Sequence, residues 1–337
     1  MRNQKISLIM PVYNSKKYLK ESLQSIFQQS YKNFNLIIID DGSSDGSNTI
    51  LSEWEKKYPD IIKVYTQENQ GQSAARNNAL NYADGEFVSF VDSDDILEAT
   101  MLEKLMDEVD DTTDIVACAY EKFISETNEI TLTRLPLSWW IEFDSKHKHL
   151  FHYTPCAKLF RTEFLKRFDI KFSIGEQLED GPYCCMSDIL ARSVKVIDFV
   201  GYHYRIHNSS TMGNVRKKGG QKPKVPYNGL SQAVVTVRNH NEDEVKDKIL
   251  EYCIIKILAG LTTNMYKNCD KETRKEICEF CYSFIKDHFP NVKKNQYIGF
   301  FKLKKLPFTH RVATKLFILS YRMHLLYPFS LIVSKVL

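Results

Sequence analysis

Short apolar runs alternate with longer amphipathic segments along the first 120 residues of the chain. The runs have the length of strands, and apolar residues between them recur every three or four positions, as in helices. Strands that alternate with helices predict βαβ units and an α/β fold with a mostly parallel sheet covered on both faces. The expected strands are Ile6–Met10, Asn35–Asp40, Ile61–Thr66, Glu86–Val91 and Asp114–Tyr120, and the expected helices lie near Lys17–Gln28, Ser47–Lys57, Ser73–Tyr82 and Met101–Val109.

Polar signals follow four of these predicted strands, namely Pro11–Asn14, Asp40–Gly46, Glu68–Gly71 and Asp92–Asp95. Ligands of such sheets bind beyond the carboxyl ends of the strands. The carboxylates of Asp92–Asp95 are hard oxygen ligands that can hold Mg²⁺ or Mn²⁺ against phosphate oxygens. Tyr13 beside a proline can form a flat wall for a base, and Asp41 can accept a pyrimidine N–H. Turn formation and helix capping explain each signal alone, but not all four together.

The pattern turns helical from about Pro226 onward, with apolar residues at helical spacing in Lys246–Tyr266, Lys271–Phe289 and Phe308–Met323. A chain of 337 residues that is 43% hydrophobic can bury a full core and holds one large and one smaller domain. We therefore predict a catalytic domain over residues 1–215, a linker over 216–225 and a helical domain over 226–337.

Positive charge is concentrated at the end of the chain. The net charge is +4, but nine Lys or Arg and no Asp or Glu follow Asp287, and residues 1–287 carry a balance of −5. No uncharged stretch of the tail reaches the roughly 20 residues that a spanning helix needs. The basic, aromatic tail predicts either contact with anionic lipid, or packing as a helical bundle or oligomer contact. Both alternatives stay open.

The eight cysteines show no framework spacing, which favours free thiols in a reducing cytoplasm. The N-terminal apolar stretch is too short for a membrane span and lacks a cleavage-site pattern. We expect a cytoplasmic protein, with the inner face of the cell membrane as the alternative location.

At this point the motifs carry a family resemblance. Pro11–Asn14, Asp40–Asp45, Asn69–Asn77 and Asp92–Asp95 resemble the family 2 glycosyltransferases, which are inverting enzymes of the GT-A fold that use nucleotide sugars, most often UDP-linked. The match covers roughly residues 5–210. It implies a GT-A nucleotide-sugar-binding domain, followed here by a smaller helical domain.

The resemblance also implies roles for residues in the first half of the chain. Nucleotide binding is expected at Pro11, Val12, Tyr13, Asp41, Arg76, Asp92 and Ser93. Asp94 would ligate Mn²⁺ or Mg²⁺, and Asp92 is a second candidate ligand. A helix that starts near Ser73 would present Arg76 in its first turn, where the helix dipole and the guanidinium both favour phosphate.

Further residues follow downstream. The resemblance assigns the general base that takes the acceptor proton to Asp180, whereas an acid that caps a helix at Pro182 is the plainer alternative. The segment Gly201–Met212 resembles the loop that closes over the diphosphate. There Arg205, Ser209 and Ser210 would contact phosphate, and His207, in competition with His203, would complete the metal shell.

Together these features predict a metal-dependent inverting glycosyltransferase of cell-surface polysaccharide synthesis. It would move a sugar from a nucleotide donor, expected to be UDP-linked, to a hydroxyl of a glycan or lipid-linked acceptor, with no nucleic-acid partner. A dehydrogenase or nucleotidylyltransferase would need a glycine-rich phosphate loop, and no G-x-G-x-x-G follows any predicted strand. A nucleotide-sugar-binding protein without chemistry is disfavoured, because both Asp94 and Asp180 are present. A homo-oligomer remains open.

Overall fold

The structure is a computed structural model that describes residues 4–134, 140–144, 146–150, 153–207, 224–266 and 268–336. The chain divides into two compact units. The first comprises Met1–Leu137, His152–Gly175 and Leu190–Ile206, and the second comprises Ser138–Phe151, Glu176–Ile189 and His207–Leu337. Two segments inside the predicted catalytic domain thus belong to the second unit. The limits drawn at residues 215 and 226 stay predictions, and most of the expected linker lies outside the described residues.

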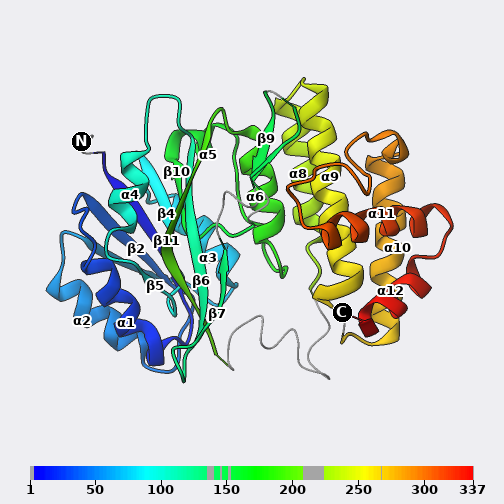
Figure 1. The fold of residues 1–337 in the computed structure, drawn as a ribbon. Coiled ribbons are helices and arrows are strands. Elements are labelled where there is room, and N and C mark those ends of the chain that lie inside the picture. The colour runs from blue at the N-terminus through cyan, green and yellow to red at the C-terminus, as the bar shows by residue number, and fades with distance from the viewer. Residues whose placement is uncertain are drawn as a thin grey trace. The chain divides into compact units, whose positions relative to one another are not determined.

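A sheet of nine described strands forms the centre of the first unit (Figure 1). Its order is β3-β2-β1-β4-β10-β6-β11-β5, with β7 paired to β6. The strands are β1 (Ile6–Val12), β2 (Phe34–Asp40), β3 (Ile62–Thr66), β4 (Phe87–Phe90), β5 (Ile96–Leu97), β6 (Ile115–Ile124), β7 (Ile130–Arg134), β10 (Lys158–Arg161) and β11 (Val194–Ile206). The strands β1 to β4 pair in parallel, as do β6 and β11, whereas β10 runs antiparallel between β4 and β6.

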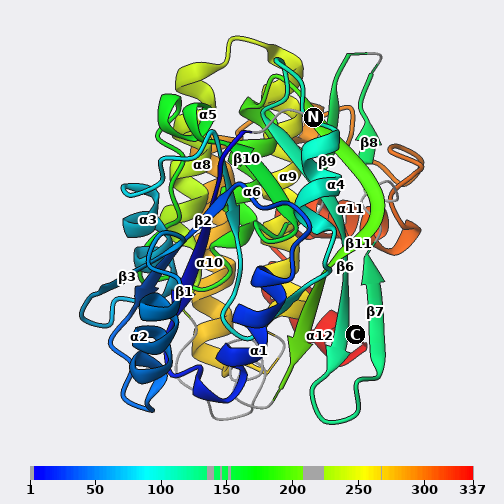
Figure 2. The ribbon, with the colours of Figure 1, turned by 90° about the vertical axis from the view of Figure 1, so that its left-hand side faces the viewer.

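Helices cover both faces of this sheet: α1, α2 and α4 lie on one face and α3 on the other (Figures 1 and 2). Their bounds are α1 (Lys16–Phe27), α2 (Ser47–Lys57), α3 (Gln72–Leu80) and α4 (Met101–Asp107), with the short α5 (Thr162–Arg167) after β10. The chain moves outward from β1 to β3 and then crosses back to β4. Since such crossovers are right-handed, the reversal puts α3 on the opposite face. The predicted α/β class with a mostly parallel sheet is confirmed.

The strand register brings the predicted polar signals to one edge. Val12 pairs with Asp40, and Asp40 in turn pairs with Thr66. The pairing of β1 with β4 ends at Ile9 and Phe90, so the acidic loop leaves the sheet beside the last residues of β1. Every residue of β1 and β4 is buried, as expected for strands covered on both faces.

The second unit is mainly helical. It contains α6 (Asp180–Leu190) apart from its last residue, α8 (Tyr227–His240), α9 (Glu244–Gly260), α10 (Lys271–His288), α11 (Phe308–Arg322), α12 (Leu326–Val336) and a hairpin of β8 (Trp140–Glu142) and β9 (Lys148–Leu150). The helix α9 has buried residues around its whole circumference between Ile249 and Ala259, which marks it as the central helix of the unit. Over the described part of the chain, no helix combines the length and apolar character that crossing a membrane requires.

A histidine between two carboxylates fastens the hairpin to α9. The ring nitrogens of His147 lie 2.8 Å from a carboxylate oxygen of Asp144 and 2.8 Å from one of Asp243. Asp243 is also the N-cap of α9 and accepts the N–H of Val245. An ionised carboxylate cannot donate, so both bonds form together only when both ring nitrogens carry hydrogen and the imidazole is charged. Burial opposes this charge, but the bonds to Asp144 and Asp243 outweigh it and raise the pKa of His147.

This geometry predicts a pH-dependent contribution of His147 to stability. Because the folded pKa is raised, the stabilisation is complete below the unfolded pKa of about 6.5 and is lost as pH rises through the folded value. We expect His147→Gln to lower the melting temperature by on the order of 2 °C at pH 6 and to have no effect at pH 9. Thermal unfolding of both proteins across this range is the measurement.

The matched control is His240→Gln, which changes an exposed histidine whose ring nitrogen lies 2.9 Å from the backbone oxygen of Thr236. Its effect should not vary with pH in the same way. If the melting-temperature difference for His147→Gln is equal at pH 6 and pH 9, a charged His147 between Asp144 and Asp243 does not stabilise the fold.

Candidate functional site

The acidic loop after β4 is held by a carboxylate that points into the protein. Asp95 is 1% exposed, and its two oxygens accept the hydroxyl of Tyr202 at 2.7 Å and the backbone N–H of Arg205 at 2.8 Å. Both donors come from β11. The neighbours Asp92 and Asp94 are only half-buried. The loop thus keeps one carboxyl inside as an anchor and presents two others at the sheet edge.

The electrostatics of this anchor are unusual for a carboxyl group. Burial, followed by the negative charges of Asp94 and Asp92, raises the pKa of Asp95 well above its usual value. The backbone N–H of Arg205 and the hydroxyl of Tyr202 act in the opposite direction. Burial and the charge of Asp95 also raise the pKa of Tyr202, so its hydroxyl stays protonated and can donate.

Arg205 braces the same loop. Its Nε donates to the backbone oxygen of Asp94 at 2.7 Å, and its Nη2 forms an ion pair with Glu21 at 2.6 Å. The guanidinium lies over the rings of Tyr18 and Phe123, each 4.8 Å from the ring centroid. The family resemblance implies a diphosphate contact for Arg205, which stays a prediction. In this structure the guanidinium joins α1, β6 and the acidic loop.

Arg76 contacts Asp92 directly. Its side chain is 1% exposed, lies over the ring of Phe172 and donates from Nη2 to Asp92 Oδ1 at 2.7 Å. The helix α3 begins at Gln72, one residue before the predicted start, so Arg76 is its fifth residue and lies just after the first turn. The pair brings a fixed positive charge beside the acidic loop, and Asp92 keeps 26% of its side chain exposed.

Asp41 organises the loop between β3 and α3. It is 2% exposed and accepts three N–H groups, from the Gln67 side chain at 2.8 Å and from the backbones of Gln70 at 2.9 Å and Gly71 at 2.8 Å. These bonds use three of the roughly four lone-pair positions of a carboxylate. A pyrimidine N–H at Asp41 would therefore share the carboxylate with this loop.

The remaining predicted nucleotide residues lie at the ends of β1 and β4. Pro11 and Val12 are buried within β1, whereas Tyr13 is 53% exposed. Ser93 is buried, and its hydroxyl lies 2.6 Å from that of Ser15. Of Pro11 and Tyr13, which were expected to line the pocket for the base, Tyr13 is thus the side chain that is accessible to a ligand.

The predicted catalytic base belongs to the second unit. Asp180 is the first residue of α6 and is half-buried, and the preceding Glu179 is 3% exposed. Nearby, the carboxylate of Glu176 accepts the backbone N–H groups of Asn228 at 2.7 Å and Gly229 at 2.9 Å, and so caps α8. His207 follows β11 and is half-buried. Ser209 and Ser210 lie outside the described residues.

The residues of the first unit fit a divalent cation that is shared with a ligand. Within the described ranges, no group of three or more His, Cys, Asp or Glu could hold a metal. Asp92 and Asp94 supply hard carboxylate oxygens, and Mg²⁺ is commonly held by one or two carboxylates plus substrate phosphates. Mn²⁺ accepts the same oxygen ligands. The donor set therefore matches a cation whose shell is completed by a diphosphate.

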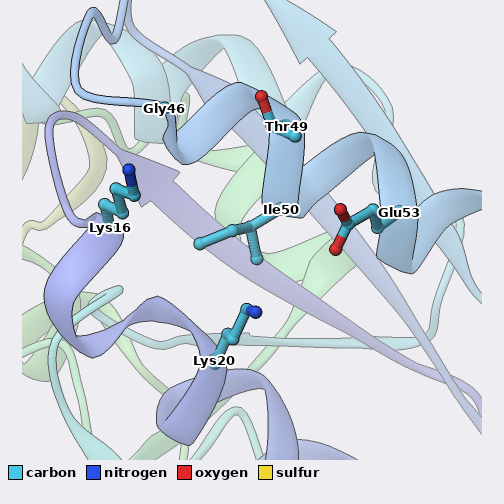
Figure 3. Close-up of a pocket in the computed structure, with 6 residues that line it drawn as sticks. All are labelled: Lys16, Lys20, Gly46, Thr49, Ile50 and Glu53. Atoms are coloured by element: carbon cyan, nitrogen blue, oxygen red, sulfur yellow. The ribbon is translucent and has the colours of Figure 1, made fainter.

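A separate hollow of about 400 Å³ lies between the N-terminal halves of α1 and α2 (Figure 3). It is lined by Lys16, Lys20, Gly46, Thr49, Ile50 and Glu53. None of the predicted site residues is among them. Asp45, which precedes this part of α2, already accepts the N–H groups of Lys16 and Ser47.

Comparison with solved structures identifies the class of fold. The chain matches Staphylococcus aureus TarS, residues 1–349 in complex with UDP-GlcNAc, with a TM-score of 0.73 at 23% identity over 95% of this chain and 92% of TarS. It also matches the mannosyltransferase PcManGT of Pyrobaculum calidifontis, in complex with GDP-Man and Mn²⁺, with a TM-score of 0.54 at 18% identity over 99% and 86% of the two chains. The predicted GT-A fold with a smaller C-terminal helical part is confirmed.

Sequence comparison finds a family match for residues 7–168. These residues match the model of glycosyl transferase family 2, so the chain carries a domain of this family. EpsH of Bacillus subtilis, named as a glycosyltransferase, is 33% identical over 65% of each chain. The minor teichoic acid biosynthesis protein GgaB of Bacillus subtilis is 30% identical over 73% of this chain and 27% of its own length. The chain thus spans less than two thirds of these relatives.

The sequence missed two side chains that shape the site. Asp95 was counted among the carboxylates of the acidic cluster, without the inward anchoring role that the structure shows. Tyr202 lay unassigned in the segment that holds Arg205. Alternation along β11 offered a signal, since residues 202 and 204 point to the opposite face from 203 and 205. The pairing of β11 with β5, which joins Tyr202 to Leu97, could not be derived from that pattern.

Removal of the Tyr202 hydroxyl should loosen the acidic loop. The variant Tyr202→Phe deletes a donor to Asp95 and an acceptor for the backbone N–H of Asp92, which lies 3.1 Å away. Two polar groups would lose a hydrogen-bond partner, so we expect the free energy of unfolding to fall by about 1–3 kcal/mol. Chemical denaturation is the measurement.

The control is Tyr65→Phe, the same deletion on β3, where the ring stacks on Tyr82 at a centroid distance of 3.9 Å. It should change stability much less. Equal stability of Tyr202→Phe and the unaltered protein would show that the hydroxyl does not support the loop.

Proposed function

We propose that this protein is a metal-dependent, inverting glycosyltransferase that transfers a hexose from a nucleotide sugar to a hydroxyl of a glycan or lipid-linked acceptor. The observation that carries the proposal is the pair Asp92 and Asp94, presented at the sheet edge by the anchored Asp95. Asp41 and Tyr13 follow the neighbouring strands at the same edge. These groups suit a nucleoside diphosphate. Asp92 and Asp94 can hold a cation against the diphosphate, the ring of Tyr13 can contact the base, and the buried carboxylate of Asp41 can accept an N–H of the base.

Relatives support the donor and the biological context. TarS is described in complex with UDP and with UDP-GlcNAc, and PcManGT with GDP-Man and Mn²⁺. GgaB is named for minor teichoic acid biosynthesis. We therefore propose a UDP-sugar donor, Mn²⁺ or Mg²⁺ as the cation and a role in cell-surface polysaccharide synthesis.

The proposed chemistry is a single displacement at the anomeric carbon. Asp180 takes the proton of the acceptor hydroxyl as its oxygen attacks, and the nucleoside diphosphate leaves from the opposite side of the sugar. The configuration inverts, following the geometry of inverting hydrolysis with an alcohol in place of water. When bound, the cation offsets the charge that develops on the leaving diphosphate. Arg76 adds a fixed positive charge beside Asp92. For Asp180, the proposal rests on the family resemblance.

Replacing the proposed metal ligand should weaken nucleotide binding. For Asp94→Ala we expect a loss of affinity for UDP in the presence of Mn²⁺ of at least tenfold, because the carboxylate shares the cation with the diphosphate. Isothermal titration with and without Mn²⁺ is the measurement. The exposed Asp60→Ala should bind like the unaltered protein. Unchanged metal-dependent binding by Asp94→Ala would place the cation on another group.

Replacing the proposed base should separate binding from transfer. For Asp180→Asn we expect UDP affinity within a few fold of the unaltered protein and a loss of transfer of roughly 10²–10⁴-fold, since the base acts in the transition state. A radiolabelled transfer assay and UDP titration together check this. The exposed Asp287→Asn, also in the second unit, serves as control.

Substantial turnover by Asp180→Asn would put the base elsewhere. If the unaltered protein binds UDP with Mn²⁺ yet transfers no sugar from any UDP-sugar to any glycan tested, the nucleotide-sugar-binding alternative is favoured instead.

A further inference from the structure

An apolar stripe runs along the solvent side of α11. Phe308, Leu316 and Met323 are 58%, 39% and 65% exposed, and Val312 and Leu319 are half-buried between them. These five residues follow one another at intervals of three or four positions, so they share one side of the helix. Five apolar side chains of a fifteen-residue helix thus form a continuous row along and just past its length.

The opposite side of α11 makes the packing contacts. Thr314, Phe317 and Ile318 are buried, and they lie about half a turn from the exposed row. The helix therefore packs on the unit through this side. The exposed row is additional apolar surface that packing within the unit leaves in water.

Basic side chains border the exposed row. Lys315 lies three residues after Val312 and four before Leu319, and Arg322 lies three after Leu319, so both flank the row on one side. Just before the helix, Phe301 is 81% exposed, and exposed lysines follow at 302, 304 and 305. The chain after Asp287 holds nine Lys or Arg and no Asp or Glu. An apolar row with basic side chains along one side and no acidic residue on the helix is the pattern of a helix that lies in a membrane interface.

We propose that the α11 row, Phe308, Val312, Leu316, Leu319 and Met323, lies in the headgroup region of a bilayer that contains anionic lipids. Lipid tails accept the apolar side chains, and lipid phosphates accept the flanking charges. A second copy of the chain is a poorer occupant. A two-fold contact through this row would bring the same basic border of both copies together, with no acidic residue of the tail to offset it.

The test uses the full chain and vesicles of known composition. We expect the protein to co-sediment with phosphatidylcholine vesicles that contain phosphatidylglycerol and not to bind vesicles of pure phosphatidylcholine. Added salt should release the bound protein, because it screens the charges. The double variant Leu316→Ser with Met323→Ser should bind about tenfold more weakly or worse, because two apolar side chains no longer enter the interface. Lys315→Gln should lose roughly fivefold, the loss expected for one phosphate-facing charge.

Matched controls lie elsewhere in the same unit. Val235→Ser removes an apolar side chain that is 51% exposed on α8, and Lys286→Gln removes an exposed charge on α10. Both should bind vesicles like the unaltered protein, and thermal unfolding of each variant should show an intact fold.

Three results would overturn the proposal: no binding of the full chain, equal binding by the α11 variants, or a dimer that Leu316→Ser with Met323→Ser converts to a monomer. The last result would assign the row to a second copy. No step of this test uses sugar transfer, so the outcome is independent of the proposed enzymatic function.

Discussion

The buried carboxyl of Asp95 is the constraint on which the geometry of the candidate site depends. A carboxyl group taken out of water costs free energy unless donors meet it, and here both donors come from β11. The loop after β4 can therefore adopt its shape only when β11, more than 100 residues further along the chain, has joined the sheet. Arg205 strengthens the same link by holding the backbone of Asp94. The positions of Asp92 and Asp94 therefore depend on the pairing of β11 in the sheet.

The charges around this loop rank the two candidate ligands. Arg76 already neutralises one oxygen of Asp92, at 2.7 Å, and burial raises the pKa of Asp95. Arg205 contacts the backbone oxygen of Asp94 at 2.7 Å. A cation bound at Asp92 would share that carboxylate with Arg76. This supports Asp94 as the first proposed ligand and Asp92 as the second.

The sheet and its flanking helices could be predicted because local pattern and tertiary structure agree there. The strand predicted over Asn35–Asp40 differs from β2 only in its start, which is Phe34 in the structure. The helix predicted over Ser47–Lys57 has the same bounds as α2. The strands β10 and β11 were not predicted. β10 has only four residues, and β11 mixes polar and apolar positions, so each is defined by its pairing with β6. The hairpin of the second unit likewise depends on His147 and Asp243, 96 residues apart.

Contacts between segments that lie far apart in the sequence could not be predicted from the motifs. The family resemblance implies a phosphate contact for Arg205, which stays a prediction. No motif reveals its ion pair with Glu21, 184 residues away. The same limit applies to α11. Helical spacing of Phe308, Leu316 and Met323 correctly predicts a common face, yet spacing cannot say whether that face turns inward or outward. In the structure Phe317 fills the inner side, so the predicted apolar face is the outer one. The basic side chains beside this outer face fit the proposed contact with anionic lipid, whereas on an inward face they would oppose packing.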